Sequence, residues 1–225
     1  MMLHQTQVPR VDAAWSAFIT RFPTPEAMAD AGPGAVIEAW GRLGYPRRAR
    51  RLWDAAVLIA ASGWPDDLTE LPGVGRYTAN AVRAQADGSD VPAVEVNVRR
   101  VVERVRGRRL TEREAEAAMV EVGAPLRDRD RLLALMDIGA TLCRPHVPRC
   151  AECPLHDACA TKGPLEGATT SRQAPFEGSF RQQRGVVLAR LRAGPTPVAL
   201  LDTRALRSLV SDGLATVDGD LACLP

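Results

Sequence analysis

The sequence predicts a mostly α-helical protein, and three observations carry this prediction. Apolar residues recur at helical spacing from the N-terminus to about Ala160, alternating strand patterns are nearly absent over that stretch, and joins rich in Gly and Pro separate the periodic segments. The joins are PTP at 23–25, GPG at 32–34 and GWPDD at 63–67. The predicted apolar faces are Val11, Ala14, Trp15 and Phe18; Leu52, Ala55, Ala56 and Ile59; Val94, Val98, Val101, Val102 and Val105; and Leu132, Leu135, Met136 and Gly139.

The bulk properties are those of an ordinary globular chain. Its 225 residues are enough for one large domain or two modest ones. No run of about 18 apolar residues is present, which excludes a membrane-spanning helix. The N-terminus has no charged region followed by an apolar one, so we expect no signal peptide and a cytoplasmic location.

Positive charge is clustered, although the net charge of +2 does not by itself indicate nucleic-acid binding. Residues 98–110 contain six arginines and one glutamate, and residues 44–51 read GYPRRARR. Such clusters suit contacts with phosphate groups. A solvated helix face explains the same pattern, and on the clusters alone it is the favoured interpretation.

The chain changes character after the helical region. Residues 162–184 are rich in Gly, Pro, Ser, Thr and Gln and are predicted to form a linker. Beyond them the sequence predicts helices at 186–191 and 205–214, and a hairpin whose strands, 215–217 and 221–224, pair across Asp218-Gly219. We therefore expect a small winged-helix-like tail at 185–225.

Four cysteines give the strongest chemical signal: Cys143, Cys150, Cys153 and Cys159 form the pattern C-x6-C-x2-C-x5-C. Four thiolates within 17 residues can surround one metal centre, and a reducing cytoplasm disfavours structural disulfides. Zinc is the alternative, but its sites usually join two knuckles across a longer insert, whereas this is one compact loop. We therefore predict a [4Fe–4S] cluster on these residues. Cys223 stands apart and is interpreted as a small buried apolar residue.

A glycine-containing turn precedes the cysteines. Residues 71–79 read LPGVGRYTA, in which Gly73, Val74 and Gly75 form a segment that can turn tightly and approach a ligand closely. The turn opens a helix, and the free amides at a helix N-terminus can bind a phosphate. A short GVG is a weak signal alone, because any helix–helix turn can contain one.

In this order, LPGVGRYTA and the cysteine loop that follows LMDIGATLC resemble the helix-hairpin-helix DNA glycosylases, which include endonuclease III and the MutY-type adenine glycosylases. The resemblance implies a six-helix-barrel-type domain at residues 1–94, which includes the helix-hairpin-helix, and an iron–sulfur cluster domain at residues 95–161. In that family the cluster is structural and electronic, not hydrolytic. The loop between the first two cysteines contacts DNA phosphate, a role that would fall to Arg144 and Arg149.

Tyr77 distinguishes two branches of this family. Endonuclease III-like enzymes place a lysine at the matching position, whose amine attacks the sugar and allows strand cleavage. Tyrosine cannot form that Schiff base, and MutY-type enzymes commonly carry serine or tyrosine there. The resemblance therefore implies a monofunctional adenine glycosylase. The structural alternative is a tyrosine that only packs at the start of a helix.

Two further segments match the MutY-type enzymes. Residues 2–8, MLHQTQV, resemble the family's MLQQTQV, where polar side chains enter the duplex beside the oxidised guanine; Gln5 and Thr6 would do so here. Tyr45 lies in an LGY motif whose tyrosine inserts at the lesion in that family. A core aromatic is the alternative for Tyr45, and the family context favours insertion.

The catalytic carboxylates depart from the family pattern. Glu95 occupies the place of the family's aspartate in PAVEVNVRR, and Asn97 matches its asparagine. Such a carboxylate stabilises the cationic sugar as the base leaves. The family's second carboxylate, a glutamate acid, falls two residues before Met2, outside the printed sequence. We therefore expect slow excision by the chain as printed.

The resemblance implies a base-excision repair enzyme that acts as a monomer on double-stranded DNA and removes adenine paired with 8-oxoguanine, in a bacterial cytoplasm at the nucleoid. The tail is shorter than the nudix-like domain with which many relatives read 8-oxoguanine. Two alternatives stay open: an endonuclease III-like glycosylase and lyase on oxidised pyrimidines, which Tyr77 disfavours, and a non-catalytic DNA-binding remnant.

Overall fold

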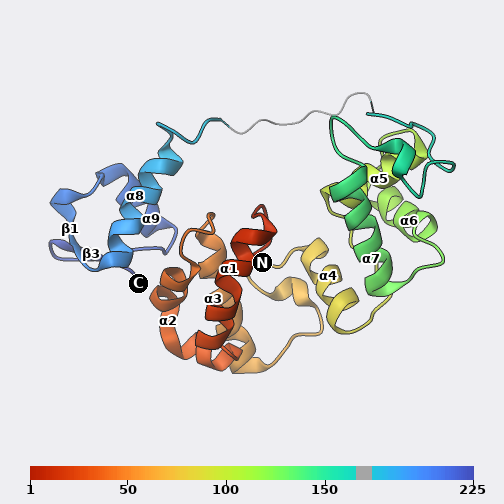
Figure 1. Cartoon of the computed structure of the whole chain (residues 1–225). Helices are drawn as coiled ribbons and strands as arrows, with labels where there is room; N and C mark the ends of the chain where they lie inside the picture. Colours follow the sequence, from red (N-terminus) through yellow and green to blue (C-terminus); the bar gives the residue numbers. More distant parts are fainter. Residues whose placement is uncertain (166–173) are drawn as a thin grey trace. The chain divides into compact units, whose positions relative to one another are not determined.

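The computed structural model describes residues 1–165 and 174–225, and it is mostly helical with one small sheet (Figure 1). The predicted fold class is thereby confirmed at the level of secondary structure. The chain divides into two compact units. The first contains Met1–Gly73 together with residues 174–225, and the second begins at Val74 and includes residues 74–165.

The first unit begins with three helices: α1 (Val8–Arg21), α2 (Pro25–Trp40) and α3 (Arg47–Ser62). The PTP join starts α2, because the hydroxyl of Thr24 accepts a hydrogen bond from the amide of Ala27 and Pro25 occupies the first helical position. The GPG join bends α2 at Gly32, whose φ of 78° is left-handed. The side chains of Phe18, Val36, Ile37 and Trp40 are buried in this unit's core.

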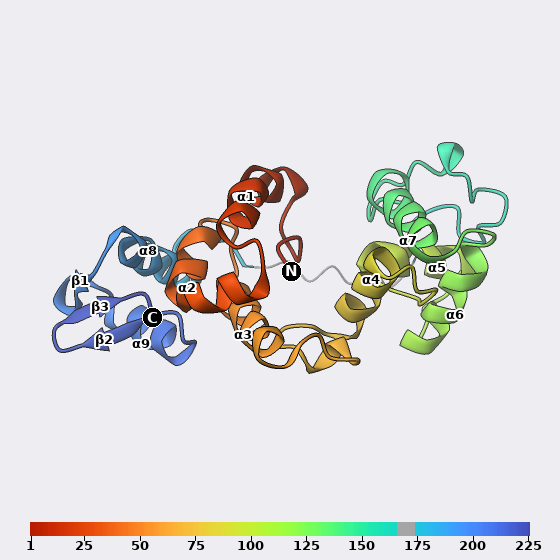
Figure 2. The same cartoon turned by 90° about the horizontal axis from the view of Figure 1, so that it is seen from below.

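The C-terminal segment has the element order of a winged helix. It contains α8 (Phe180–Ala193), β1 (Thr196–Pro197), α9 (Thr203–Ser211), β2 (Thr216–Asp218) and β3 (Leu221–Cys223). Figure 2 shows the strands beside these helices, in the antiparallel order β1-β3-β2. The two predicted helices and the hairpin across Asp218-Gly219 are confirmed, although the first helix begins six residues earlier than its apolar pattern, at Phe180 instead of Val186.

This segment packs against α2 and α3 and shares their core. Leu188, Leu191 and Leu209 belong to the same buried cluster as Val36 and Ile37. Three polar contacts join the same elements. Arg192 Nε donates to Ile37 O at 3.2 Å, and Arg50 Nη1 donates to Gly213 O at 3.1 Å. Arg47 Nη2 pairs with Asp212 Oδ1 at 2.6 Å. The contacts therefore group the tail with the first helices.

The second unit contains α4 (Arg76–Ala86), α5 (Val96–Arg106), α6 (Glu112–Val122) and α7 (Asp128–Asp137), followed by the π-helical turn η2 (Ile138–Leu142) and the cysteine loop. Thr111 and Glu114 form a capping box that starts α6. Successive turns of α5 bury Val98, Val101 and Val102, as the apolar pattern predicts.

The boundary between the two units lies at Gly73 and Val74, inside the first of the predicted domains 1–94, 95–161, 162–184 and 185–225; that division stays a prediction. Part of the predicted linker, residues 166–173, lies outside the described residues. Among the helices that the structure describes, none combines the length and the apolar character that crossing a bilayer requires.

Candidate functional site

Glu95, the candidate catalytic carboxylate, is the N-cap of α5. Its Oε1 accepts the backbone amides of Asn97 at 2.8 Å and Val98 at 2.9 Å, and its Oε2 accepts Asn97 Nδ2 at 3.1 Å. A carboxylate at this end of a helix is favoured by the helix dipole. Three donors therefore hold the side chain in one direction.

Tyr77 lies in the first turn of α4. Burial raises the pKa of the Tyr77 phenol, and the negative charge of Glu95 raises it further. The phenol is consequently neutral at physiological pH. The Tyr77 side chain also packs against the core of the second unit, as the packing interpretation of this residue expects.

A chain of hydrogen bonds leads from Glu95 to the first cysteine. Asn97 Oδ1 accepts from Arg100 Nη2 at 2.6 Å, and Arg100 Nε donates to Cys143 O at 2.7 Å. Arg100 Nη2 also donates to Gly139 O at 2.7 Å. Gly139 has no room for a side chain, because a Cβ built on it would lie 2.7 Å from Asn97 Cβ. The π-helical turn therefore packs directly on the residue that orients Glu95.

The four predicted cluster ligands line one small cavity, together with Arg104. Burial raises the pKa of the Cys153 thiol; a hydrogen bond from the Leu155 backbone opposes this, and the other three cysteines raise it. Within the described residues, no three His, Cys, Asp or Glu side chains converge closely enough to hold a single metal ion. A cubane does not need that convergence, because each thiolate binds a different iron.

Arg104 supports an anionic group in this cavity. It is buried, with 3% of its surface exposed, and Nη1 donates to Cys143 Sγ at 3.3 Å. The same guanidinium donates to the carbonyls of Arg144 and Pro145, both at 2.8 Å, and the Arg104 carbonyl accepts from Thr161 Oγ1 at 2.8 Å. One residue of α5 thus holds both ends of the cysteine loop and brings a positive charge to the thiols. The residues present fit an iron–sulfur cluster.

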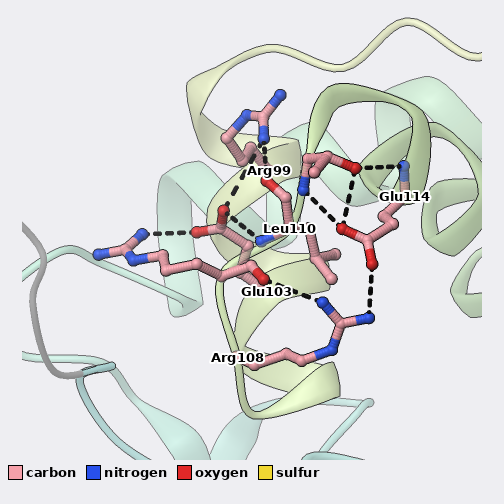
Figure 3. Close-up of polar contacts among 7 residues, drawn as sticks. Arg99, Glu103, Arg108, Leu110 and Glu114 are labelled. Atoms are coloured by element: carbon pink, nitrogen blue, oxygen red, sulfur yellow. Dashed lines mark hydrogen bonds and ion pairs between the residues drawn. The ribbon is translucent and has the colours of Figure 1, made fainter.

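The arginine-rich segment 98–110 is not a free basic surface. Glu103 is 3% exposed and pairs with Arg99 at 3.8 Å and with Arg109 at 2.5 Å. Arg108 pairs with Glu114 at 2.8 Å; Figure 3 shows Glu103 beside Arg99 and Glu114 beside Arg108. Arg106 pairs with Glu121, and Arg100 and Arg104 hold the cysteine loop. Every arginine of the segment therefore has a protein partner, and Arg106, Arg108 and Arg109 are also exposed to solvent, as a solvated helix face predicts.

Arg144 and Arg149 are exposed on the loop between the first two cysteines. Arg149 makes two contacts with Glu152, at 2.7 and 2.5 Å, and Arg144 Nε donates to Thr141 O at 3.0 Å. Contact of these two side chains with DNA stays a prediction.

The glycine-containing turn has the local conformation that a helix-hairpin-helix requires. Gly73 has a φ of 80°, and a Cβ built on it would lie 2.6 Å from Met1 Cε and 3.0 Å from Arg51 Cβ. Gly75 is the extended N-cap of α4, and no side chain caps that helix. The first amides of α4 therefore have no capping side chain, as a phosphate-binding helix start requires, with Val74 between the two glycines.

The residues expected to enter the duplex come from two adjoining segments of the first unit. Gln5 and Tyr45 are exposed, Tyr45 by 42%, and both have left-handed backbones, with φ of 54° and 46°. Thr6 Oγ1 donates to Leu43 O at 3.1 Å, which joins the segments. Sequence reasoning missed Arg48, which lies between them; its only signal was the basic run that suggested phosphate contacts.

Residues 1–125 match the HhH-GPD superfamily of base excision DNA repair proteins. An adenine DNA glycosylase from Mycolicibacterium smegmatis is 43% identical over 98% of this chain and 84% of its own length. Another from Mycobacterium tuberculosis is 42% identical over 98% of this chain and 82% of its length. A solved thermostable thymine-DNA glycosylase superposes with a TM-score of 0.64 at 25% identity, covering 72% of this chain and 80% of the other.

Proposed function

This chain belongs to the HhH-GPD superfamily of base excision DNA repair proteins and, within it, to the adenine DNA glycosylases, and we propose that its substrate is adenine paired with 8-oxoguanine in double-stranded DNA. It is therefore a DNA glycosylase that hydrolyses N-glycosidic bonds. The observation that carries the proposal is the carboxylate of Glu95, which three donors fix at the N-terminus of α5.

The chemistry follows from these two side chains. Once adenine is flipped out of the stack and protonated, its glycosidic bond breaks and leaves a cationic sugar. The charge of Glu95 stabilises that cation until water adds to it. Tyr77 has no amine, so no Schiff base forms and the strand is not cut. In the family that the chain resembles, a glutamate protonates the base.

We propose that Cys143, Cys150, Cys153 and Cys159 hold a [4Fe–4S] cluster. Their common cavity and the hydrogen bond from Arg104 to Cys143 support it. When bound, the cluster supplies a rigid and electronically active centre and no hydrolytic group. Anaerobic purification with iron and sulfide analysis is expected to give about four of each per chain. Stoichiometric zinc without iron contradicts this proposal.

Excision tests the substrate directly. Single-turnover assays on adenine:8-oxoguanine and adenine:thymine duplexes are to be run with the printed chain and with the chain extended by its genomic upstream codons. We expect base release only from the mispair. Borohydride on an abasic duplex is expected to trap no adduct; a covalent adduct would support a lyase on oxidised pyrimidines instead. Absence of excision by both chains would support a DNA-binding remnant.

We further propose that the protein works as a monomer in a bacterial cytoplasm, at the nucleoid. The support is the nature of the substrate, since genomic DNA is where the mispair arises. Light scattering with and without the mispaired duplex gives the oligomeric state.

A further inference from the structure

We propose that Arg48 is a positioning residue that holds Gln5 and Tyr45 together in the conformation that enters the duplex. The proposal rests on the proposed function, because it concerns how the enzyme opens the mispair. Arg48 lies in the first turn of α3, and its side chain donates hydrogen bonds to both the segment around Gln5 and the loop that contains Tyr45.

Arg48 contacts the N-terminal segment through four acceptors. Arg48 Nη1 donates to the carbonyls of Met1 at 3.0 Å and Met2 at 3.1 Å, and also to that of His4. Arg48 Nη2 donates to Thr6 Oγ1 at 2.9 Å. These acceptors surround Gln5 on both sides in the chain. The guanidinium therefore fixes the turn that contains Gln5, whose side chain is exposed.

Arg48 also contacts the loop that contains Tyr45. Arg48 Nη2 donates to Gly44 O at 3.1 Å, and the guanidinium carbon lies 5.3 Å from the centroid of the Tyr45 ring. It lies 5.2 Å from the ring of the buried Trp40, whose Nε1 donates to the same Gly44 carbonyl at 2.9 Å. Arg48 thus reaches from the core, through Trp40, to the exposed ring of Tyr45.

Backbone strain at the two predicted insertion points agrees with this role. Gln5 and Tyr45 both adopt the left-handed region, which non-glycine residues rarely occupy and which persists only where surroundings impose it. The surroundings that the two residues share are the bonds from Arg48 and the bond from Thr6 to Leu43. Loss of the hydrogen bonds from Arg48 would allow the backbone at Gln5 and at Tyr45 to leave the left-handed region.

Among the residues that the structure describes, no carboxylate forms an ion pair with Arg48. Its neighbours in α3 differ: Arg47 pairs with Asp212, and Arg50 pairs with Asp54 at 2.9 Å. In the part of the chain that the structure describes, Arg48 has only carbonyl, hydroxyl and aromatic partners. Only a planar fork with several N–H groups serves so many acceptors, and lysine, a point charge, does not.

The experiment compares the full chain with Arg48→Lys, which keeps the charge. Hydrogen exchange of residues 2–6 and 43–46 is measured without DNA. Affinity is measured for an adenine:8-oxoguanine duplex that carries 2′-fluoro-deoxyadenosine, which resists excision, and for a matched adenine:thymine duplex. Arg190→Lys is the control, because Arg190 is exposed and donates to a single carbonyl, Leu200 O. Thr6→Val, which loses one acceptor of Arg48, is a milder second variant.

We expect exchange in both segments to accelerate at least tenfold in Arg48→Lys, and the preference for the mispaired duplex to fall at least fivefold. Thr6→Val should change both in the same direction, and Arg190→Lys neither. Unchanged exchange overturns the proposal, as does accelerated exchange with an unchanged preference. If the unaltered chain itself shows no preference, the proposed substrate is wrong, and the exchange data alone decide whether Arg48 fixes the two segments.

Discussion

Adding one methyl group at Gly139 is expected to disturb catalysis without touching the carboxylate itself. In Gly139→Ala the new Cβ would lie 2.7 Å from Asn97 Cβ and 2.9 Å from Asn97 O. Carbon atoms in good contact lie about 3.5–4.0 Å apart, so Asn97 or the π-helical turn has to shift by about 1 Å. Asn97 donates to both oxygens of Glu95, so the shift reaches the catalytic carboxylate.

The size of the effect follows from this displacement. Misplacement of a catalytic group by about 1 Å costs about a hundredfold in rate. Overpacking a well-packed contact also destabilises the fold, by about 1–3 kcal/mol. We therefore expect Gly139→Ala to fold, to unfold at a lower temperature, and to release adenine about a hundredfold more slowly in a single-turnover assay with the upstream-extended chain.

Gly185→Ala provides the matched control. Gly185 lies in α8, and a Cβ built on it meets nothing within 4 Å. Alanine there should leave the excision rate unchanged and raise stability by up to about 1 kcal/mol. A folded Gly139→Ala variant that excises within threefold of the unaltered rate would refute the reasoning, because it would show that Glu95 does not depend on the packing under Asn97.

Three other predictions test the charges of the two units. Glu95→Gln removes the charge and keeps the shape, so single-turnover excision should fall at least about a hundredfold; an unchanged rate would place the sugar-stabilising group elsewhere. Replacing Arg144 and Arg149 together with alanine should reduce the slope of log affinity against log salt by about 2 if each contacts one phosphate, and an equal slope would remove the loop from the interface. Asp212→Asn should lower thermal stability at pH 7, whereas the exposed Asp218→Asn should not. Burial raises the pKa of Asp212, but its hydrogen bonds from Arg47 and Arg184 outweigh this and lower the pKa, so the stabilisation is present above the unfolded pKa and disappears as the pH falls through the lower folded value. A stability difference that grows in acid contradicts that sign.

Local sequence patterns predicted the parts of this fold that local physics determines. The apolar period of α5 buries Val98, Val101 and Val102, and the Asp218-Gly219 signal forms the turn between β2 and β3. Both depend on residues a few positions apart, so a periodicity or a turn preference suffices to find them. The pattern of cysteines likewise identified a group of side chains that share one cavity.

The partners of charged side chains could not be predicted in this way. Arg50 donates to Gly213, and Arg47 and Arg184 both pair with Asp212, over distances in sequence that no local pattern encodes. The run GYPRRARR therefore suggested phosphate contacts, while part of it docks the tail. Arg48 was missed for the same reason, since its role depends on carbonyls that come from another segment.

The arrangement of α5 gives a physical account of why a hydrolytic enzyme would retain a metal cluster. The helix carries Glu95 at its N-terminus, and Arg100 and Arg104, one and two turns further along, hold the carbonyls of the cysteine loop. Guanidinium groups buried among carbonyls have a high desolvation cost unless every partner stays in place. A loop whose ends are fixed by a cluster supplies partners that stay in place, whereas a free loop does not. With the cysteines holding a cluster, Arg100 and Arg104 would keep in place the helix that orients Glu95.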